Sequence, residues 1–147
     1  MILIDSNILI YAYNADSPHH SIAHDWLNQK LNGTTQVGLP WLSILAFLRI
    51  STNPRAFPNP ASIAEAWRQV AEWLARESVW MPQPTERHPG ILGDLLTQGR
   101  VQGNSVMDTH LAALAIEHGL TLCSADGDFA KFRGLRWFNP LAQDEVG

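Results

Sequence analysis

Cysteine, lysine and long apolar runs are all scarce in this sequence of 147 residues. Cys123 is the single cysteine, so an internal disulfide is impossible and a reducing compartment is favoured. No basic segment opens the chain, and the first apolar run stops at Asp5, far short of a signal-peptide core or a membrane span. Glycine-rich phosphate loops are missing too. We therefore expect a cytoplasmic protein that is neither exported nor anchored in a membrane.

The length and composition fit one ordinary domain, residues 1–147, with a real core, since 46% of the residues are hydrophobic. The formal net charge is −4, which by itself disfavours a polyanionic partner such as RNA. Four aspartates, Asp5, Asp108, Asp126 and Asp128, together carry a charge of −4, and bound divalent cations would reverse the sign of the charge around them. The eight arginines, against two lysines, would then suit phosphate recognition.

Short apolar runs alternate with amphipathic stretches along the chain. The runs that predict buried strands are residues 1–4, 36–38, 79–81, 120–123 and 135–138. The stretches that predict helices are residues 8–12, 18–31, 40–49, 63–74, 84–99 and 105–118, with Asn32-Gly33 and Gly119 as C-terminal stops. The prolines of segment 53–60 predict a loop that links two halves of the domain. This alternation indicates an α/β fold with a parallel sheet and helices on both faces.

Acidic residues stand where predicted strands end and where the last predicted helix begins. Asp5 follows the first strand, and Asp108 lies in the first turn of that helix. Asp126 and Asp128 follow the fourth strand. Ligands of an open α/β sheet bind beyond the carboxyl ends of its strands, so these acids are expected to converge in one crevice. Convergent carboxylates predict a divalent metal site.

Each acid also has a purely structural interpretation. Asp5 could cap the following helix, but Ser6 and Asn7 add more polar groups than a cap requires. Asp108 could close a capping box with Ser105, a role that is compatible with metal binding.

The third acidic segment, Ser124-Ala-Asp-Gly-Asp-Phe129, could be an ordinary turn. We expect one of its aspartates to reach the metal while the other shapes the loop or caps the short helical turn that follows. Asp126 is the better candidate because it lies nearer the end of the strand.

Other chemistry-bearing residues favour structural roles. His20 and His24 have i,i+4 spacing but lack the glutamate of a zincin motif, so they are expected in the core or on the surface. Cys123 lies within an apolar strand and matches no nucleophile signature. Trp26 and Trp67 lie on apolar helical faces, which indicates core or a partner surface rather than base stacking.

These motifs together resemble the PIN-domain ribonucleases, specifically the VapC-type toxins of bacterial type II toxin–antitoxin pairs. The resemblance covers essentially the whole chain, because four motifs occur in order with suitable spacing. They are Asp5-Ser-Asn-Ile-Leu-Ile-Tyr-Ala, Met107-Asp-Thr-His-Leu-Ala-Ala-Leu-Ala, Ser124-Ala-Asp-Gly-Asp-Phe and the closing Gly134-Leu-Arg-Trp-Phe-Asn-Pro-Leu. The resemblance implies a PIN-like three-layer α/β/α fold with a central, mostly parallel sheet.

The chain departs from the family in one place. Leu45-Ala-Phe-Leu-Arg49 resembles the second-acid motif, in which a glutamate would stand at the position of Ala46. A natural loss and a deliberate substitution would both produce Ala46. The presence of the other three acids and of the rest of the motif favours a substitution.

The resemblance implies a metal-dependent endoribonuclease. Asp5 and Asp108 would hold a principal Mg²⁺ or Mn²⁺ ion, and Asp126 would help to place a second ion or the attacking water. It also implies an RNA substrate, a homodimer and a cognate antitoxin whose tail would cross the acidic cleft. Ala46 should cost at least ~10²-fold in cleavage rate.

Two alternatives remain open from the sequence. Haloacid-dehalogenase-type phosphatases also place a nucleophilic aspartate after the first strand, but they need a second aspartate where this chain has Asn7. A catalytically silent PIN module that binds RNA or an antitoxin is the stronger alternative, and Ala46 supports it.

Overall fold

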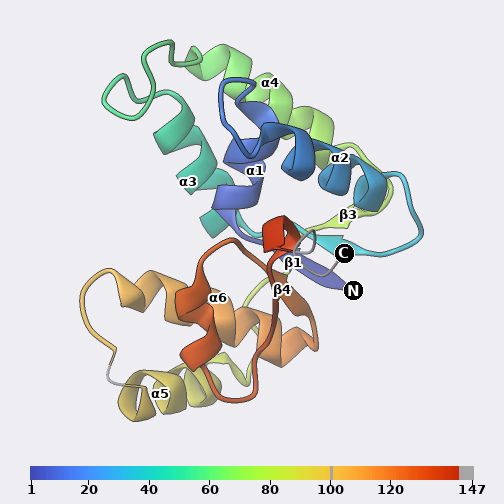
Figure 1. Cartoon of the computed structure of the whole chain (residues 1–147). Helices are drawn as coiled ribbons and strands as arrows, with labels where there is room; N and C mark the ends of the chain where they lie inside the picture. The colour runs from blue at the N-terminus through green and yellow to red at the C-terminus, as the bar shows by residue number, and fades with distance from the viewer. Residues whose placement is uncertain (100, 143–147) are drawn as a thin grey trace.

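The computed structural model describes residues 1–99 and 101–142. In them one sheet of five parallel strands runs in the order β3-β2-β1-β4-β5 (Figure 1). The strands are β1 (Ile2–Ile4), β2 (Val37–Gly38), β3 (Val79–Trp80), β4 (Thr121–Cys123) and β5 (Arg136–Phe138). The helices are α1 (Ser6–Tyr13), α2 (His20–Leu31), α3 (Trp41–Ser51), α4 (Ile63–Leu74), α5 (His88–Gln98), α6 (Ser105–His118) and the 3₁₀ helix η1 (Gly127–Lys131). The predicted strand and helix order is confirmed.

Strand β1 lies at the centre of the sheet, between β2 and β4. Leu3 and Ile4 are both fully buried, and they belong to different hydrophobic cores. Successive side chains of a strand point to opposite faces, so a strand covered on both sides must be apolar at every position. The continuous run of residues 1–4 is explained by this placement.

Helices cover both faces of the sheet. Figure 1 shows α1, α2, α3 and α4 gathered on one side and α5 and α6 on the other. The core under the first group includes Ile8, Leu27, Phe47 and Val70, and the core under the second includes Leu95, Leu111 and Leu114. The expected three-layer α/β/α arrangement is confirmed. None of the helices in the described part of the chain is both long enough and apolar enough to cross a bilayer.

The predicted C-terminal ends of two helices, α2 and α6, are confirmed. Asn32 is the C-cap of α2, and its backbone N–H bonds to the carbonyl of Asn28. Gly119 ends α6 with a φ of 68°, in the left-handed region that glycine adopts without strain. Pro54, Pro58 and Pro60 lie in the loop between α3 and α4, as expected.

The start of α5 was predicted wrongly. Helical structure begins at His88, not at Pro84-Thr85. The backbone N–H of Thr85 donates to the side chain of Glu117 at 2.6 Å, and its carbonyl accepts from the N–H of His88 at 3.0 Å. Thr85 therefore forms a turn tied to α6, and the helix starts only after it.

The two tryptophans on apolar helical faces separate into different environments. Trp26 on α2 is 6% exposed and belongs to the core. Trp67 on α4 is 46% exposed. The sequence left core and surface positions open for both tryptophans. Trp26 lies in the core and Trp67 lies on the surface.

A candidate acidic active site

The carboxyl ends of β1 and β4 place two acidic segments side by side. The two strands are paired in parallel, with Ile4 opposite Cys123. The backbone N–H of Asp5 donates to the carbonyl of Cys123 at 3.0 Å. Asp5 and the loop after β4 therefore leave the sheet at the same edge, where the topology of an open α/β sheet predicts a ligand site.

Asp5 is both a helix cap and an acid whose charge is disfavoured. Its Oδ1 accepts from the N–H of Ser6 at 2.7 Å and makes it the N-cap of α1. Its Oδ2 accepts from the Ser124 hydroxyl at 2.7 Å. Burial nevertheless raises the pKa of Asp5, and the charge of Asp126 adds to that rise, while the hydrogen bonds oppose it. The capping role and a ligand role are compatible, because the carboxylate retains unused lone pairs.

A polar clamp around Asn7 joins α1 to the loop after β4. The Asn7 amide donates to the Ser124 hydroxyl at 3.1 Å, and its carbonyl oxygen accepts from the N–H of Ala125 at 3.2 Å. The Ser124 hydroxyl also accepts from the N–H of Asp126 at 3.0 Å. Asn7 and Ser124 therefore position Asp5 and Asp126 relative to one another. The sequence signalled a surplus of polar groups at Ser6 and Asn7 but gave neither Asn7 nor Ser124 this role.

Asp108, in the first turn of α6, is a partly buried carboxyl group under the influence of the other acids. Burial, followed by the charges of Asp5 and Asp126, raises its pKa to about 6, and the nearby Lys131 acts in the opposite direction. The capping-box alternative for Asp108 was wrong. Asn104 is the N-cap residue, without a side-chain cap bond, and the Ser105 hydroxyl instead accepts from Lys131 at 3.4 Å.

The expected division of roles between Asp126 and Asp128 was wrong in one respect, because Asp126, the predicted metal ligand, is itself the residue that caps the short helical turn. Asp126 is the N-cap of η1 and accepts from the N–H of Asp128 at 2.9 Å. Its charge acts on the pKa of both Asp5 and Asp108, whereas Asp128 is exposed and acts on Asp108 alone with a smaller effect. Asp126 is thus the acid of this loop that is electrostatically coupled to both others.

A cleft of about 420 Å³ opens beside these acids. Its walls come from the start of α1, from α3 and from the start of α6. Asp5 and Asp108 line it, and so do Ala46 and Arg49 on α3. Ala46, at the position where the sequence lacks an expected acid, therefore faces the same cleft as two of the acids.

The donor chemistry fits a hard divalent cation. The three aspartates supply oxygen ligands, and the mutual repulsion of their charges would be relieved by an ion such as Mg²⁺ or Mn²⁺. Among the residues that the structure describes, no three His, Cys, Asp or Glu side chains come close enough together to hold one ion. The metal role of Asp5, Asp108 and Asp126 stays a prediction.

The two histidines and the cysteine for which the sequence predicts structural roles show no sign of chemical activity in the structure. The Nδ1 of His20 lies 3.0 Å from the carbonyl of Tyr11, and its ring lies 5.2 Å from that of His24. Burial raises the pKa of the Cys123 thiol to about 12, so it stays protonated and unreactive at neutral pH.

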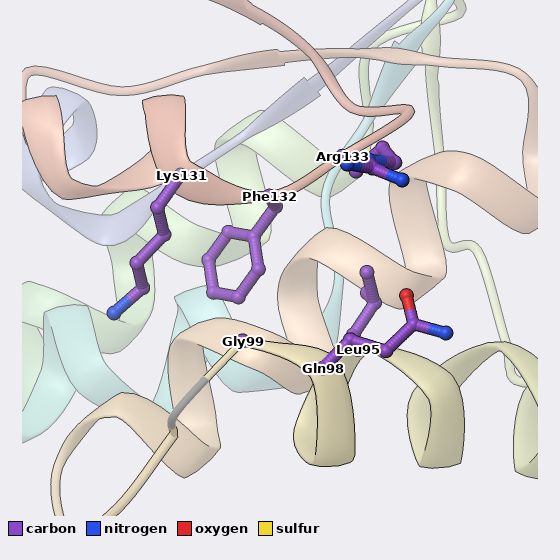
Figure 2. A pocket seen from close by; sticks show the side chains of 6 residues that line it. All are labelled: Leu95, Gln98, Gly99, Lys131, Phe132 and Arg133. Atoms are coloured by element: carbon purple, nitrogen blue, oxygen red, sulfur yellow. The ribbon is translucent and has the colours of Figure 1, made fainter.

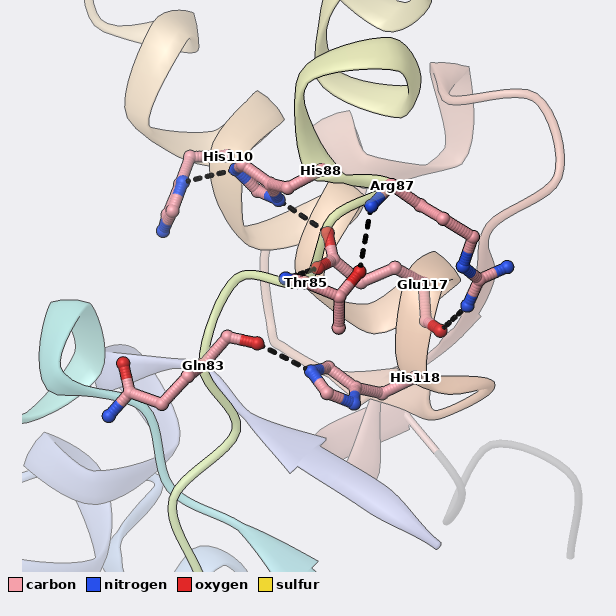
Figure 3. A network of polar contacts seen from close by, with 7 residues as sticks. All are labelled: Gln83, Thr85, Arg87, His88, His110, Glu117 and His118. Atoms are coloured by element: carbon pink, nitrogen blue, oxygen red, sulfur yellow. Dashed lines mark hydrogen bonds and ion pairs between the residues drawn. The ribbon is translucent and has the colours of Figure 1, made fainter.

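A second buried carboxylate, missed by the sequence analysis, lies at the other end of α6 (Figure 3). Glu117 is 4% exposed and accepts from the N–H of Thr85 at 2.6 Å and from His88. The other ring nitrogen of His88 lies 3.1 Å from Nδ1 of His110. Burial alone would raise the pKa of Glu117, but these hydrogen bonds hold it below its ordinary value. Nothing local in the sequence marks this network, because its members come from different elements.

The chain matches the model of the PIN domain over residues 2–135. It is 44% identical over 142 residues to Ribonuclease VapC37 of Mycobacterium tuberculosis, a match that covers 97% of this chain and 99% of that relative. It is 38% identical to Ribonuclease VapC43 of the same organism, over 96% of both chains.

Solved structures share the fold at lower identity. The VapBC2 crystal structure from Rickettsia felis, bound to a DNA fragment from its promoter, matches with a TM-score of 0.70 and 18% identity, over 95% of this chain and 98% of that chain. Mycobacterium tuberculosis VapC20, described as a sarcin-ricin loop cleaving toxin, matches with a TM-score of 0.65 and 17% identity, over 92% and 99% of the two chains.

Proposed function

The chain belongs to the PIN-domain family, as a relative of the VapC ribonucleases, and on that premise we propose that it is an Mg²⁺- or Mn²⁺-dependent endoribonuclease toxin. Its substrate would be RNA, and its site of action the cytoplasm. Asp5, Asp108 and Asp126 would hold the metal. The observation that carries this proposal is the raised pKa of Asp108, caused by burial and by the charges of Asp5 and Asp126. Carboxyl groups in a cleft whose pKa is raised by burial and by neighbouring acids are typical of functional sites.

A bound divalent ion would supply a water nucleophile at neutral pH and stabilise the leaving oxygen of the phosphodiester. The chain's own residues would prepare the site. Asp5 is held by Ser6 and Ser124, and the Asn7 clamp fixes the loop that carries Asp126. This framework pre-orients the carboxylates, so little reorganisation is needed when they act.

Ala46 makes this particular chain a weak enzyme in our proposal. Its methyl group lines the cleft beside Asp5 and Asp108 but offers neither a charge nor an oxygen ligand. We expect cleavage to be at least ~10²-fold slower than with glutamate at this position.

The decisive experiment compares Ala46→Glu with Ala46→Gln. Both variants add similar bulk to α3, but only the first adds a carboxylate. We expect Ala46→Glu to cleave a broad pool of RNAs with Mg²⁺ or Mn²⁺ and Ala46→Gln to remain as slow as the parent. An Ala46→Glu protein that stays inert with both ions, while folded, would contradict the nuclease proposal.

A catalytically silent binding module is the second candidate, and Ala46 itself favours it. Calorimetric titration with Mn²⁺ separates the two. A nuclease-type site should bind Mn²⁺, at least in the Ala46→Glu protein, and lose it in an Asp108→Asn variant. A protein that binds RNA or an antitoxin but never Mn²⁺ would support the silent module.

We further propose an antitoxin partner and a homodimer. Structural relatives of this chain include VapBC complexes, such as VapBC-1 from nontypeable Haemophilus influenzae, with a TM-score of 0.67 and 21% identity over 95% of this chain and 98% of that chain. The coupled acids of the cleft would attract a cationic antitoxin side chain in place of the metal. Competition between Mn²⁺ and a basic antitoxin peptide, followed by calorimetry, tests this arrangement. Sedimentation of the isolated protein tests the dimer.

A further inference from the structure

A second pocket, which carries basic side chains, lies between the end of α5 and the segment that follows η1 (Figure 2). Its volume is about 300 Å³. One wall is the end of α5, and the other is the segment that leaves η1. Figure 2 shows Phe132 pointing toward the end of α5, with Lys131 and Arg133 leaving the chain on either side of it. The lining residues are Leu95, Gln98, Gly99, Lys131, Phe132 and Arg133.

The charge of this pocket contrasts with that of the chain. It combines two exposed cations in a protein whose formal net charge is −4. Across residues 1–99 and 101–142, no carboxylate forms an ion pair with Lys131 or Arg133. The Lys131 ammonium lies 5.2 Å from the centroid of the Phe132 ring, a cation–π contact that keeps the lysine stem along the pocket wall. The two cations are therefore available to an anionic ligand.

Lys131 also connects the pocket to the acidic cleft. Its ammonium donates to the hydroxyl of Ser105, the first residue of α6, at 3.4 Å. Asn104 and Asp108, on either side of Ser105 in the chain, line the acidic cleft. A polymer that crosses the cleft at Asp108 can therefore continue past Ser105 and Lys131 into the basic pocket.

The lining chemistry suits a nucleotide better than a protein segment. A guanidinium and an ammonium match phosphate oxygens, the former in a two-pronged geometry. The Gln98 amide offers both a donor and an acceptor, as the edge of a base requires. Phe132 is only 5% exposed, so the pocket presents little apolar surface to an amphipathic helix. Its volume is at the lower end of the range for small-ligand sites.

We infer that this pocket is a subsite for one nucleotide of a single-stranded RNA, binding a phosphate through Lys131 and Arg133 and a base edge through Gln98, next to the bond that is cleaved. The inference deepens the proposed function and rests on it. Arg133 and Gln98 are substrate-binding residues here and take no part in the chemistry at the acids.

The first test measures RNA binding in the parental, cleavage-impaired protein. A fluorescein-labelled single-stranded oligoribonucleotide is titrated by anisotropy with Mg²⁺ present, and Arg133→Gln is compared with Arg55→Gln. Both variants remove one positive charge from an exposed arginine. Arg55 lies in the 53–60 loop, outside the pocket, and therefore serves as the control. We expect Arg133→Gln to raise Kd about 10-fold, Arg55→Gln to change it less than about 2-fold, and Arg133→Lys to recover part of the affinity.

The salt dependence gives an independent readout. The slope of log K against log salt should become shallower by about 0.7 in Arg133→Gln, because that variant neutralises one phosphate fewer, and stay unchanged in Arg55→Gln. Gln98→Ala should alter the preference among homopolymeric RNAs with little change in slope. Equal affinities and slopes for Arg133→Gln and Arg55→Gln would overturn the inference. Unchanged RNA binding together with weakened binding of an acidic peptide would overturn it in favour of a protein ligand.

The second test uses the Ala46→Glu background, which separates this inference from the proposed function. Arg133→Gln should raise KM about 10-fold and leave kcat within about 2-fold, because it removes binding without touching the acids. If Ala46→Glu cleaves RNA and Arg133→Gln does not change KM, the subsite is refuted and the nuclease stands. If Ala46→Glu is inert, the proposed function fails on its own evidence, and the anisotropy result still decides whether the pocket binds RNA.

Discussion

Asp108 and Glu117 lie at opposite ends of α6, and the protein shifts their pKa values in opposite directions. Both carboxyl groups are partly or wholly removed from water. At Glu117 the removal is compensated, because the N–H of Thr85 and the ring of His88 bond to the carboxylate. At Asp108 it is not, because the charges of Asp5 and Asp126 disfavour its ionised form more than the ammonium of Lys131 favours it. One helix thus carries a satisfied carboxylate that ties α5 to α6 and an unsatisfied one that faces a cleft.

The contrast indicates which group serves stability and which serves function. A charge that the protein neutralises internally has no need of an external partner. A charge that the protein leaves repelled by its neighbours stores free energy that a cation can release on binding. The two ends of α6 should therefore respond differently to substitution, to metal and to pH.

The largest effect should appear in catalysis. In the Ala46→Glu background, Asp108→Asn should lower RNA cleavage by at least ~10²-fold, because it removes a metal ligand and its charge. Glu117→Gln should leave the rate per folded molecule within about 3-fold. Single-turnover cleavage assays of the two variants, normalised to the folded fraction, measure the contrast. Equal decreases would mean that the two carboxylates do not differ in function.

The next largest effect should appear in stability, and here Glu117 should matter more than Asp108. Glu117→Gln should lower the free energy of unfolding by about 2–3 kcal/mol, because His88 is left without its buried anionic partner. Glu86→Gln, an exposed neighbour in the segment before α5, should change it by less than about 0.5 kcal/mol. Urea unfolding followed by circular dichroism gives both values. A decrease in the Glu117 variant no larger than in the Glu86 variant would remove the structural role.

Metal binding should then distinguish the two ends by thermal stability. Saturating Mn²⁺ should stabilise the Ala46→Glu protein by about 1–3 kcal/mol, because the folded state alone assembles the acids. Mn²⁺ should raise the free energy of unfolding by the same amount when Glu117→Gln is added to this protein, and should not raise it when Asp108→Asn is added. Melting curves with and without a chelator provide the measurement, and a Mn²⁺ shift that persists in Asp108→Asn would place the ion elsewhere.

The smallest effect should be a pH dependence in the metal-free protein. The pKa of Asp108 is raised from 3.8 to about 6, so between these values the folded state binds a proton that the unfolded chain does not. The free energy of unfolding therefore gains about 1 kcal/mol as pH falls from about 6 to about 4, a figure reduced because solvent screens this partly exposed group.

The network at the other end of α6 acts in the opposite sense. Burial and the neighbouring His88 lower the pKa of His110 below 6.5, so stability decreases as pH falls through that value. In Asp108→Asn the opposing gain is lost and this decrease remains. Its stability should fall more steeply below pH 6.5 than that of the parent, and parallel pH profiles would show that Asp108 titrates normally.

Most of the fold could be predicted because its signals are local. The apolar run of residues 1–4 required a strand buried on both faces, and Gly119 marked a helix end that needs a positive φ. The start of α5 could not be predicted. It depends on a bond between Thr85 and Glu117, 32 positions apart, which the residues around Pro84 do not reveal.

The site could be predicted in outline only. Acids that follow neighbouring parallel strands must leave the sheet at one edge, so the proximity of Asp5 and Asp126 follows from topology. The Asn7 clamp spans 117 positions, and no periodic pattern reports an interaction of that range. The capping-box pattern at Ser105 misled for a similar reason, since Lys131 from η1 donates to the hydroxyl that the box would have used.

The bond between Ser124 and Asp5 joins groups that are 119 positions apart. During translation, the first acid therefore leaves the ribosome long before the segment that orients it has been synthesised. A chain truncated ahead of residue 121 would lack β4 and the loop beyond it, and its central strand would keep a bare edge. The orientation that Ser124 imposes on Asp5 is therefore acquired only after β4 and the residue that follows it have been synthesised.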